Sequence, residues 1–227
     1  IQKWFFESSF NKANHWNQSF IIITPDLEVD KLRESVAKLV DYHDAFRLRY
    51  KKADDGNNIQ YYDHNAITPE LRILDITMLG IKEGSKEFGI KLHEIFTNWQ
   101  SEFNLEQGPT YNIGYIHGYA DGSARVHFAL HHLVVDTVSW RVLLEDLRTL
   151  YEEGELGLKG SSYRQWGIAI SEYAISHEVE KAYWSNILVD YNNSQLSKLI
   201  VSEGIKTYAS IQLSQEQTKK LLRDSNK

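Results

Sequence analysis

The chain has 227 residues, 42% of them apolar and 25% charged, as in an ordinary soluble globular protein with one large or two small domains. The formal net charge of −6 and the lack of a long Lys/Arg cluster argue against nucleic acid or an anionic membrane as the main partner. No cysteine is present, which excludes disulfides, a thiolate nucleophile and a cysteine-ligated metal, and fits a cytoplasmic location. Because the first residue is not methionine, we expect the chain to belong to a longer polypeptide.

The first half of the chain alternates between helical and strand patterns. The amphipathic opening at residues 2–6 favours a short helix. The β-branched run Phe20-Ile21-Ile22-Ile23 stops at Pro25, which predicts a strand. Asp26 is the candidate N-cap of a helix that ends near His43. Further strands are expected at residues 46–50, 59–62 and 71–76, the first two forming a hairpin.

The second half combines one hairpin with several helices. Apolar spacing predicts helices over 90–103, 138–151, 163–176, 179–188 and from 215. Strands at 111–116 and 125–130 form the hairpin, and 208–213 alternates like another strand. This mixture favours an α+β fold, with a mixed sheet and helices in two layers, over a doubly wound parallel sheet.

Two adjacent histidines follow the strand at 125–130, where a turn opens the next helix. Because side chains alternate along a strand, His131 and His132 should point to opposite faces. If the strand persists through them, His131 shares a face with His127 and His132 shares a face with Phe128. An imidazole at a strand end beside a loop can serve as a general base, since its unperturbed pKa of ~6.5 leaves it largely neutral at cytosolic pH.

Other interpretations of these residues are structural. A single histidine on a strand more often has a structural role. A metal site built from His127, His131 and His132 has poor geometry, because adjacent side chains diverge and residues four apart on a strand are separated by about 13 Å. A Ser-His-Asp triad that uses Ser139 lacks a nucleophile elbow. Asp136 can either cap the helix after it or pair with an arginine.

Three ordered blocks resemble one enzyme superfamily. Residues 131–140 read His-His-Leu-Val-Val-Asp-Thr-Val-Ser-Trp. They match the His-His-x-x-x-Asp signature of the chloramphenicol acetyltransferase-like superfamily, which includes the condensation and epimerization domains of nonribosomal peptide synthetases. The extended segment through Leu147 and the opening block at residues 1–19 are similar to the epimerization branch, and residues 43–50 resemble a third block of the family.

The resemblance implies a two-lobed fold. The N-terminal lobe of an epimerization domain is expected at residues 1–190, a linker at 191–207 and the truncated beginning of the C-terminal lobe at 208–227. Each lobe is a mixed sheet flanked by helices, and the active site lies in a tunnel between the lobes. The glutamate of the second lobe is missing from this sequence, so we expect the isolated chain to be inactive.

The reaction that the resemblance implies is inversion, from L to D, of the α-carbon of an aminoacyl or peptidyl thioester. The substrate hangs on the phosphopantetheine arm of a peptidyl carrier protein, and the domain itself binds neither a cofactor nor a metal. His132 is then one acid/base, and His131 supports its geometry. Asp136 pairs with an arginine, for which Arg47 is the candidate. Ser139 and Trp140 belong to the branch signature, with places near the tunnel.

Two other functions compete with epimerization. A condensation domain would use His132 to support amine attack on a thioester, and a docking module would bind a carrier protein without activity. The expected partners are a peptidyl carrier protein domain and the C-terminal lobe, with neither nucleic acid nor membrane. Thr137 departs from the superfamily, where glycine is common, so either this loop avoids positive φ or the tunnel is remodelled.

Overall fold

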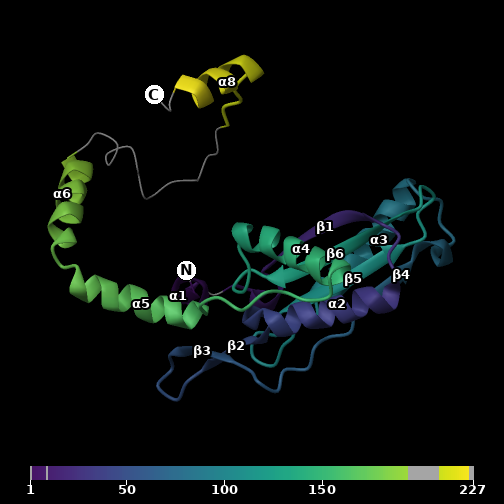
Figure 1. Cartoon of the computed structure of the whole chain (residues 1–227), viewed down its shortest axis with the longest axis horizontal. Helices are drawn as coiled ribbons and strands as arrows, with labels where there is room; N and C mark the ends of the chain where they lie inside the picture. Colours follow the sequence, from purple (N-terminus) through teal and green to yellow (C-terminus); the bar gives the residue numbers. More distant parts are fainter. Residues whose placement is uncertain (1, 9, 194–209, 225–227) are drawn as a thin grey trace. The chain divides into compact units, whose positions relative to one another are not determined.

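The computed structural model describes residues 2–8, 10–193 and 210–224 (Figure 1). The chain forms two compact units, Ile1–Ser162 and Tyr163–Lys227. Among the described residues, no helix combines the length and the apolar composition that crossing a bilayer requires.

A four-stranded mixed sheet forms the centre of the first unit (Figure 1). Its strands lie in the order β1 (Asn17–Pro25), β6 (Ser123–His131), β5 (Tyr111–His117) and β4 (Arg72–Asp75). Strands β1 and β5 each run antiparallel to β6, and β4 runs parallel to β5. The predicted α+β fold with a mixed sheet flanked by helices is therefore confirmed, as is the hairpin of β5 and β6.

Helices cover this sheet because their apolar residues recur at helical spacing. The apolar sides of α2 (Val29–Tyr42) and α4 (Thr137–Glu152) share one core with Val126, Phe128 and Leu130 of β6. The rings of Phe128 and Phe20 stack in this core, with centroids 5.1 Å apart. The helix α3 (Lys86–Gln100) packs on the opposite face of β5 and β6, where the Trp99 ring fills the space above Gly114.

The start of α2 differs from the prediction. Glu28, and not Asp26, occupies its N-cap, without a side-chain hydrogen bond. The Asp26 carboxylate instead accepts a hydrogen bond from the Tyr115 hydroxyl of β5 at 2.7 Å. Asp26 was predicted as the cap because of its place in the sequence, but the buried tyrosine needs an acceptor and takes this carboxylate.

Short elements complete the first unit. They are α1 (Gln2–Glu7), η1 (Ala13–His15), η2 (Asp44–Arg47), η3 (Ile76–Leu79) and a two-stranded sheet of β2 (Leu48–Lys52) and β3 (Asn58–Tyr62). The predicted hairpin is thus present, but its first strand begins at Leu48 and not at Phe46, because residues 44–47 form a 3₁₀ turn.

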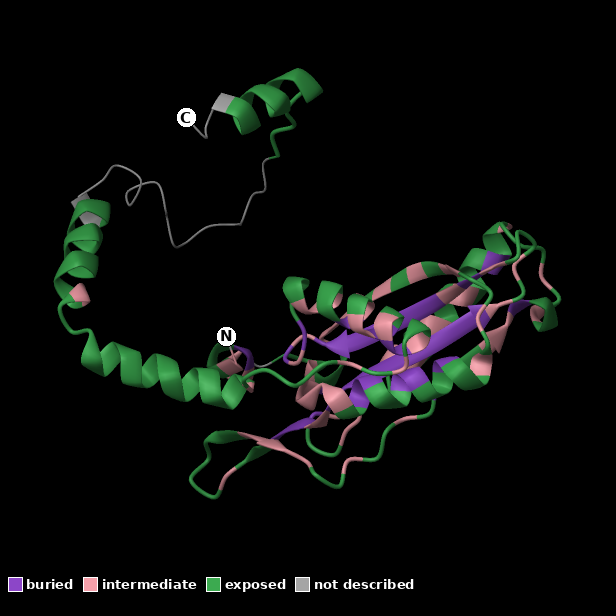
Figure 2. Ribbon diagram, in the orientation of Figure 1, coloured by how far each residue is buried: buried purple, intermediate pink, exposed green. Residues whose placement is uncertain are grey.

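The second unit consists of helices in its described part. These are α5 (Tyr163–Ser176), α6 (Glu180–Asn193) and α8 (Gln215–Asp224), and their residues are mostly exposed (Figure 2). Because α6 continues to Asn193, the first three residues of the predicted 191–207 linker are helical, and the remainder lies outside the described residues. The strand predicted at 208–213 is not formed at 210–213, and its first two residues also lie outside the described part.

A third histidine, His127, is buried between the sheet and α3. Its ring stacks on Phe96, with centroids 4.6 Å apart and planes 6° apart. Its Nε2 lies 3.4 Å from the Gln100 amide nitrogen, and its Nδ1 has no hydrogen-bond partner. Burial lowers the pKa of His127 to about 4, because the charged imidazolium loses its hydration there.

The stability of the chain should therefore fall between pH ~6.5 and ~4. In this range the unfolded chain protonates His127 and the folded chain does not, so acid favours unfolding. The stabilisation is complete above pH ~6.5, and on the order of 3 kcal/mol is lost as the pH falls through the folded pKa. Urea unfolding from pH 7.5 to 4 measures this. His127→Phe should flatten the dependence, exposed His93→Gln should not, and equal slopes in wild type and His127→Phe would contradict the argument.

Candidate active site

The buried histidine of the pair, His131, is the last residue of strand β6 and has a structural role. Its Nε2 donates to the carbonyl oxygen of Ala13 at 2.8 Å, and its Nδ1 accepts from the Leu133 N–H at 3.2 Å. The side chain is 0% exposed, and burial lowers its pKa. With both ring nitrogens engaged and charging opposed, His131 holds the turn and the N-terminal segment together.

His132 lies in the turn after β6 and is half-buried. Its Nδ1 is 3.2 Å from the Val135 carbonyl oxygen, which can only accept, so Nδ1 carries a proton. Its Nε2 is 3.2 Å from the side-chain amide nitrogen of Gln18. One face of the ring lies against Trp16, with centroids 4.6 Å apart. His132 is thus the member of the pair whose Nε2 lone pair can take a proton.

The amide of Gln18 connects His132 with Trp140. The Trp140 indole N–H donates to the Gln18 oxygen at 3.2 Å, while the amide nitrogen faces His132. Gln18 lies on β1 opposite Leu130 of β6, and this pairing brings it to the turn. The sequence analysis did not assign a role to Gln18, although it lies in the opening block that carries the family resemblance.

The opening residues of the chain pack beneath the two histidines. The Phe5 ring of α1 lies 5.5 Å from His131 and 4.8 Å from Trp16, measured between centroids. Phe5 and Trp16 belong to an apolar cluster that also contains Leu133 of the turn. From the third block, the Tyr50 hydroxyl donates to the Leu133 carbonyl at 3.1 Å. The three blocks of sequence that resemble the superfamily therefore meet at one place.

Asp136 is the N-cap of α4. One carboxylate oxygen accepts from the Ser139 N–H at 2.8 Å and from the Ser139 hydroxyl at 2.7 Å, and these bonds, the hydroxyl first, lower the pKa of Asp136. Of the two alternatives left open by the sequence, the capping role is the one formed. Asp136 has no arginine within ion-pair distance in the described part of the chain, so the predicted pairing with Arg47 was wrong.

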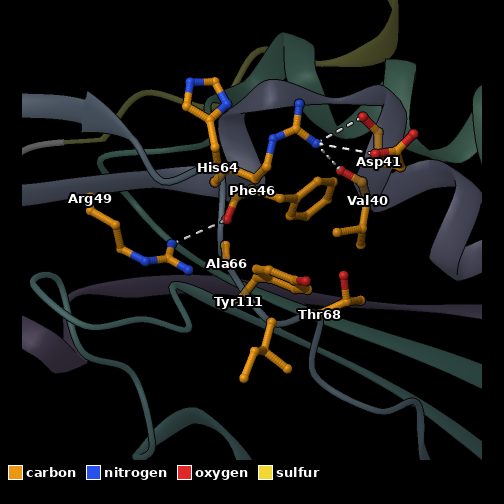
Figure 3. A pocket seen from close by; sticks show the side chains of 10 residues that line it. Val40, Asp41, Phe46, Arg49, His64, Ala66, Thr68 and Tyr111 are labelled. Carbon is orange, nitrogen blue, oxygen red and sulfur yellow. Dashed lines mark hydrogen bonds and ion pairs between the residues drawn. The ribbon is translucent and has the colours of Figure 1, made fainter.

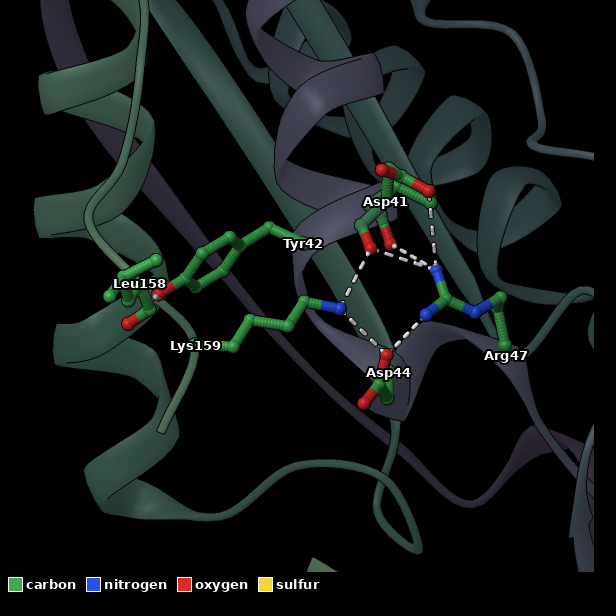
Figure 4. Close-up of polar contacts among 7 residues, drawn as sticks. Asp41, Tyr42, Asp44, Arg47, Leu158 and Lys159 are labelled. Carbon is green, nitrogen blue, oxygen red and sulfur yellow. Dashed lines mark hydrogen bonds and ion pairs between the residues drawn. The ribbon is translucent and has the colours of Figure 1, made fainter. Parts of the chain in front are cut away.

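Arg47 is bound by other carboxylates (Figure 4). It forms an ion pair with Asp44 and donates to the Asp41 main-chain carbonyl at 2.9 Å. The Lys159 ammonium reaches the same Asp44 at 2.9 Å. Because Asp44 and Arg47 stand three residues apart in one 3₁₀ turn, the local pair forms at little entropic cost. This network fastens the loop before residue 162 to the end of α2.

We expect Asp136→Ala to destabilise the chain by about 1 kcal/mol, within the 0.5–2 kcal/mol typical of a lost N-cap. This is less than the ~3–5 kcal/mol for breaking a buried ion pair. Urea unfolding measures the change. Asp136→Asn keeps a hydrogen-bond acceptor, so it should retain most of the wild-type stability. A cost above 3 kcal/mol would mean that Asp136 has a further buried partner.

Thr137 is the first residue of α4, and no non-glycine residue in the described ranges has positive φ. The loop thus avoids the conformation for which glycine would be needed. Ser139 and Trp140 follow in the first turn of this helix. The Ser139 hydroxyl donates to Asp136, and the Trp140 indole N–H donates to Gln18.

Two cavities are lined by residues of the sequence blocks described above. One of about 230 Å³ is lined by His43, Val134, Asp136 and Ser139, among others, and adjoins the turn. The other, of about 320 Å³, is lined by Arg47, Arg49 and His64, and His132 is not part of its wall (Figure 3). Its arginines already face Asp44 and Asp63. Within the described residues, no three side chains of metal-ligating type come together.

The sequence profile of the condensation domain family matches residues 1–226. The chain belongs to the condensation domain family. Among solved structures of relatives, the epimerization domain from the third module of tyrocidine synthetase B is 29% identical, with a TM-score of 0.71 over 98% of this chain and 52% of that one. The starter condensation domain of rhizomide synthetase shares the fold, at 17% identity and a TM-score of 0.63 over 85% of this chain and 46% of that one.

The curated relatives that the chain matches are much longer than the chain itself. N-(5-amino-5-carboxypentanoyl)-L-cysteinyl-D-valine synthase of Penicillium rubens is 41% identical over 98% of this chain, which spans 6% of the synthase. Gramicidin S synthase 1 of Brevibacillus brevis is 32% identical over the whole chain, which spans 21% of that enzyme. The chain thus corresponds to a small part of these synthases and to about half of the solved epimerization domain.

Proposed function

We propose that this chain is the half of an epimerization domain that carries the proton-transferring histidine, within a nonribosomal peptide synthetase. The similarity to a solved epimerization domain carries the proposal, since it extends over 98% of the chain at 29% identity. The starter condensation domain aligns over less of the chain, at 17% identity. The D-valine in the name of the Penicillium rubens synthase, a 41% identical relative, agrees with a reaction that produces a D-residue.

The proposed reaction is inversion of an α-carbon next to a thioester. The thioester acidifies the α-proton, because the electron pair left on carbon delocalises onto the carbonyl oxygen. His132 Nε2 takes this proton on one face of the carbon, and a proton delivered to the opposite face completes the inversion. Donors directed at the carbonyl oxygen would stabilise the enolate-like intermediate. The sequence resemblance assigns the opposite-face group to a glutamate outside these residues.

The substrate would arrive on the phosphopantetheine arm of a peptidyl carrier protein, in the cytoplasm. The arm would enter between this lobe and a second lobe of the same domain. In this scheme the domain binds neither metal nor cofactor of its own, and His132 supplies the chemistry. Condensation is the second candidate, because the chain belongs to the condensation family and shares the fold of starter condensation domains.

Chiral chromatography tests the proposal. The complete domain that contains this chain is incubated in D₂O with a carrier protein loaded with the L-aminoacyl thioester, and the released residue is analysed. We expect a mixture of L and D forms, with deuterium at the α-carbon. An unchanged configuration, together with a new peptide bond when an acceptor is supplied, would overturn epimerization in favour of condensation.

A further inference from the structure

We infer that Gln18 is a positioning residue for His132. Its side-chain amide, held in one orientation by Trp140, fixes His132 in the tautomer that carries its proton on Nδ1 and leaves Nε2 as the base. The inference deepens the proposed function, because it rests on His132 as the group that transfers the proton. The argument begins with the orientation of the amide.

The Gln18 amide can point in only one direction. The indole N–H of Trp140 is a donor without acceptor capacity, so the amide atom that it contacts at 3.2 Å must be the oxygen. The NH₂ group then faces His132, with its nitrogen 3.2 Å from Nε2. Reversing the amide would place two donors together at Trp140, so the indole excludes the alternative.

This orientation determines the tautomer of His132. An amide NH₂ group is only a donor, so Nε2 must accept and cannot carry a proton. On the other side of the ring, the Val135 carbonyl is only an acceptor, 3.2 Å from Nδ1. Both neighbours therefore require the same tautomer. A proton moved to Nε2 would leave two donors facing each other at Gln18 and two lone pairs facing each other at Val135.

Packing around Trp140 and His132 fixes the positions of the two rings that contact Gln18. The Trp140 ring packs edge-on against Phe20 of β1, with centroids 4.5 Å apart. The Trp16 ring limits the tilt of His132, and the His132 N–H donates to the Trp16 carbonyl at 2.9 Å. Gln18 lies between Trp16 and Phe20 in the sequence, near the start of the strand that pairs with β6. The Gln18 amide thus keeps Nε2 unprotonated before substrate binds. In the reaction, the substrate α-proton would take the place of the Gln18 N–H at this nitrogen.

The tautomer can be measured without substrate. In the complete domain labelled with ¹⁵N-histidine, two-bond ¹⁵N–¹H correlations distinguish a protonated Nδ1 from a protonated Nε2. We expect Nδ1–H for His132 in the wild type. In Gln18→Leu, which keeps the volume and removes the amide, we expect a mixture of tautomers. The kcat for inversion should fall by about 10- to 100-fold, as when other residues that orient a functional histidine are removed, with the KM for loaded carrier unchanged.

Two further variants sharpen the test. Trp140→Phe keeps Gln18 but frees its amide to reverse, so it should also yield mixed tautomers. If Gln18→Leu does not fold, Trp140→Phe still tests whether the orientation of the Gln18 amide sets the His132 tautomer. Gln100→Leu is the matched control, because Gln100 contacts buried His127 in the same way on the other side of the sheet. It should leave both the His132 tautomer and kcat unchanged.

The outcomes separate this inference from the proposed function. Nε2–H in the wild type would overturn the inference, as would an unchanged tautomer and kcat in both Gln18→Leu and Trp140→Phe. A loss of kcat with the tautomer retained would also overturn it, since Gln18 would then act in another way. Failure of the wild-type domain to invert its substrate would refute the proposed function instead, and the tautomer would still show whether Gln18 sets the ring.

Discussion

His132→Ala in the complete domain should abolish inversion and leave the fold intact. General acid–base catalysis by a positioned side chain contributes about 10²–10⁴-fold to a rate, so the variant should lose at least that factor. The fold should persist because the half-buried ring makes only two side-chain hydrogen bonds, to Gln18 and Val135, among the described contacts. Deuterium wash-in at the α-carbon and chiral chromatography measure the loss, and circular dichroism reports the fold.

The control for this variant is His93→Ala. His93 is exposed on α3, on the face of the sheet opposite to α4, and its removal should not change either rate. Wild-type rates of both deuterium exchange and inversion in His132→Ala would show that the proton-transferring group has been assigned to the wrong residue.

A protein made of residues 1–227 alone should catalyse no inversion, even with excess loaded carrier protein. Inversion needs a proton donor on the face opposite to His132, and the family resemblance places that glutamate in the second lobe. In addition, Trp166, Tyr183 and Trp184 of the second unit are each more than half exposed, which favours self-association. Chiral chromatography of the released residue and light scattering of the protein measure the two effects.

The complete domain, assayed with the same carrier protein, is the reference for this experiment. Clear inversion by a monodisperse monomer of residues 1–227 would place the second acid/base group within this sequence. The assignment of that group to the second lobe would then be wrong.

Local periodicity explains which parts of the fold could be predicted. Three elements follow from the spacing of apolar residues and from turn residues near them: the helix α2, which ends at Tyr42, the hairpin of β5 and β6, and the helix after Asp136. The same alternation placed His127 and His131 on one face of β6, where both are buried. Residues 210–213 alternate as well, but an apolar pattern forms a strand only where a neighbouring strand pairs with it.

The site depends on contacts that local pattern cannot supply. Gln18 and His132 are 114 positions apart, and only the register of β1 against β6 brings them together. Arg47 was assigned to Asp136 because of its position within the third family block, but it pairs with the nearer Asp44 instead. In both cases the decisive information is which of several polar partners is nearest in space, and the sequence does not record this.

The packing of Phe5 and Trp16 under the paired histidines has a consequence for engineering. If this domain were exchanged between synthetases, residues 7–15 would offer a mostly polar stretch for the junction. A junction there would replace Phe5, which lies against His131, while keeping Trp16, which lies against His132. The hybrid would keep the turn that carries His131 and His132 but would pack it against a foreign α1. A junction upstream of Gln2 keeps α1, η1 and the turn as one transferable block.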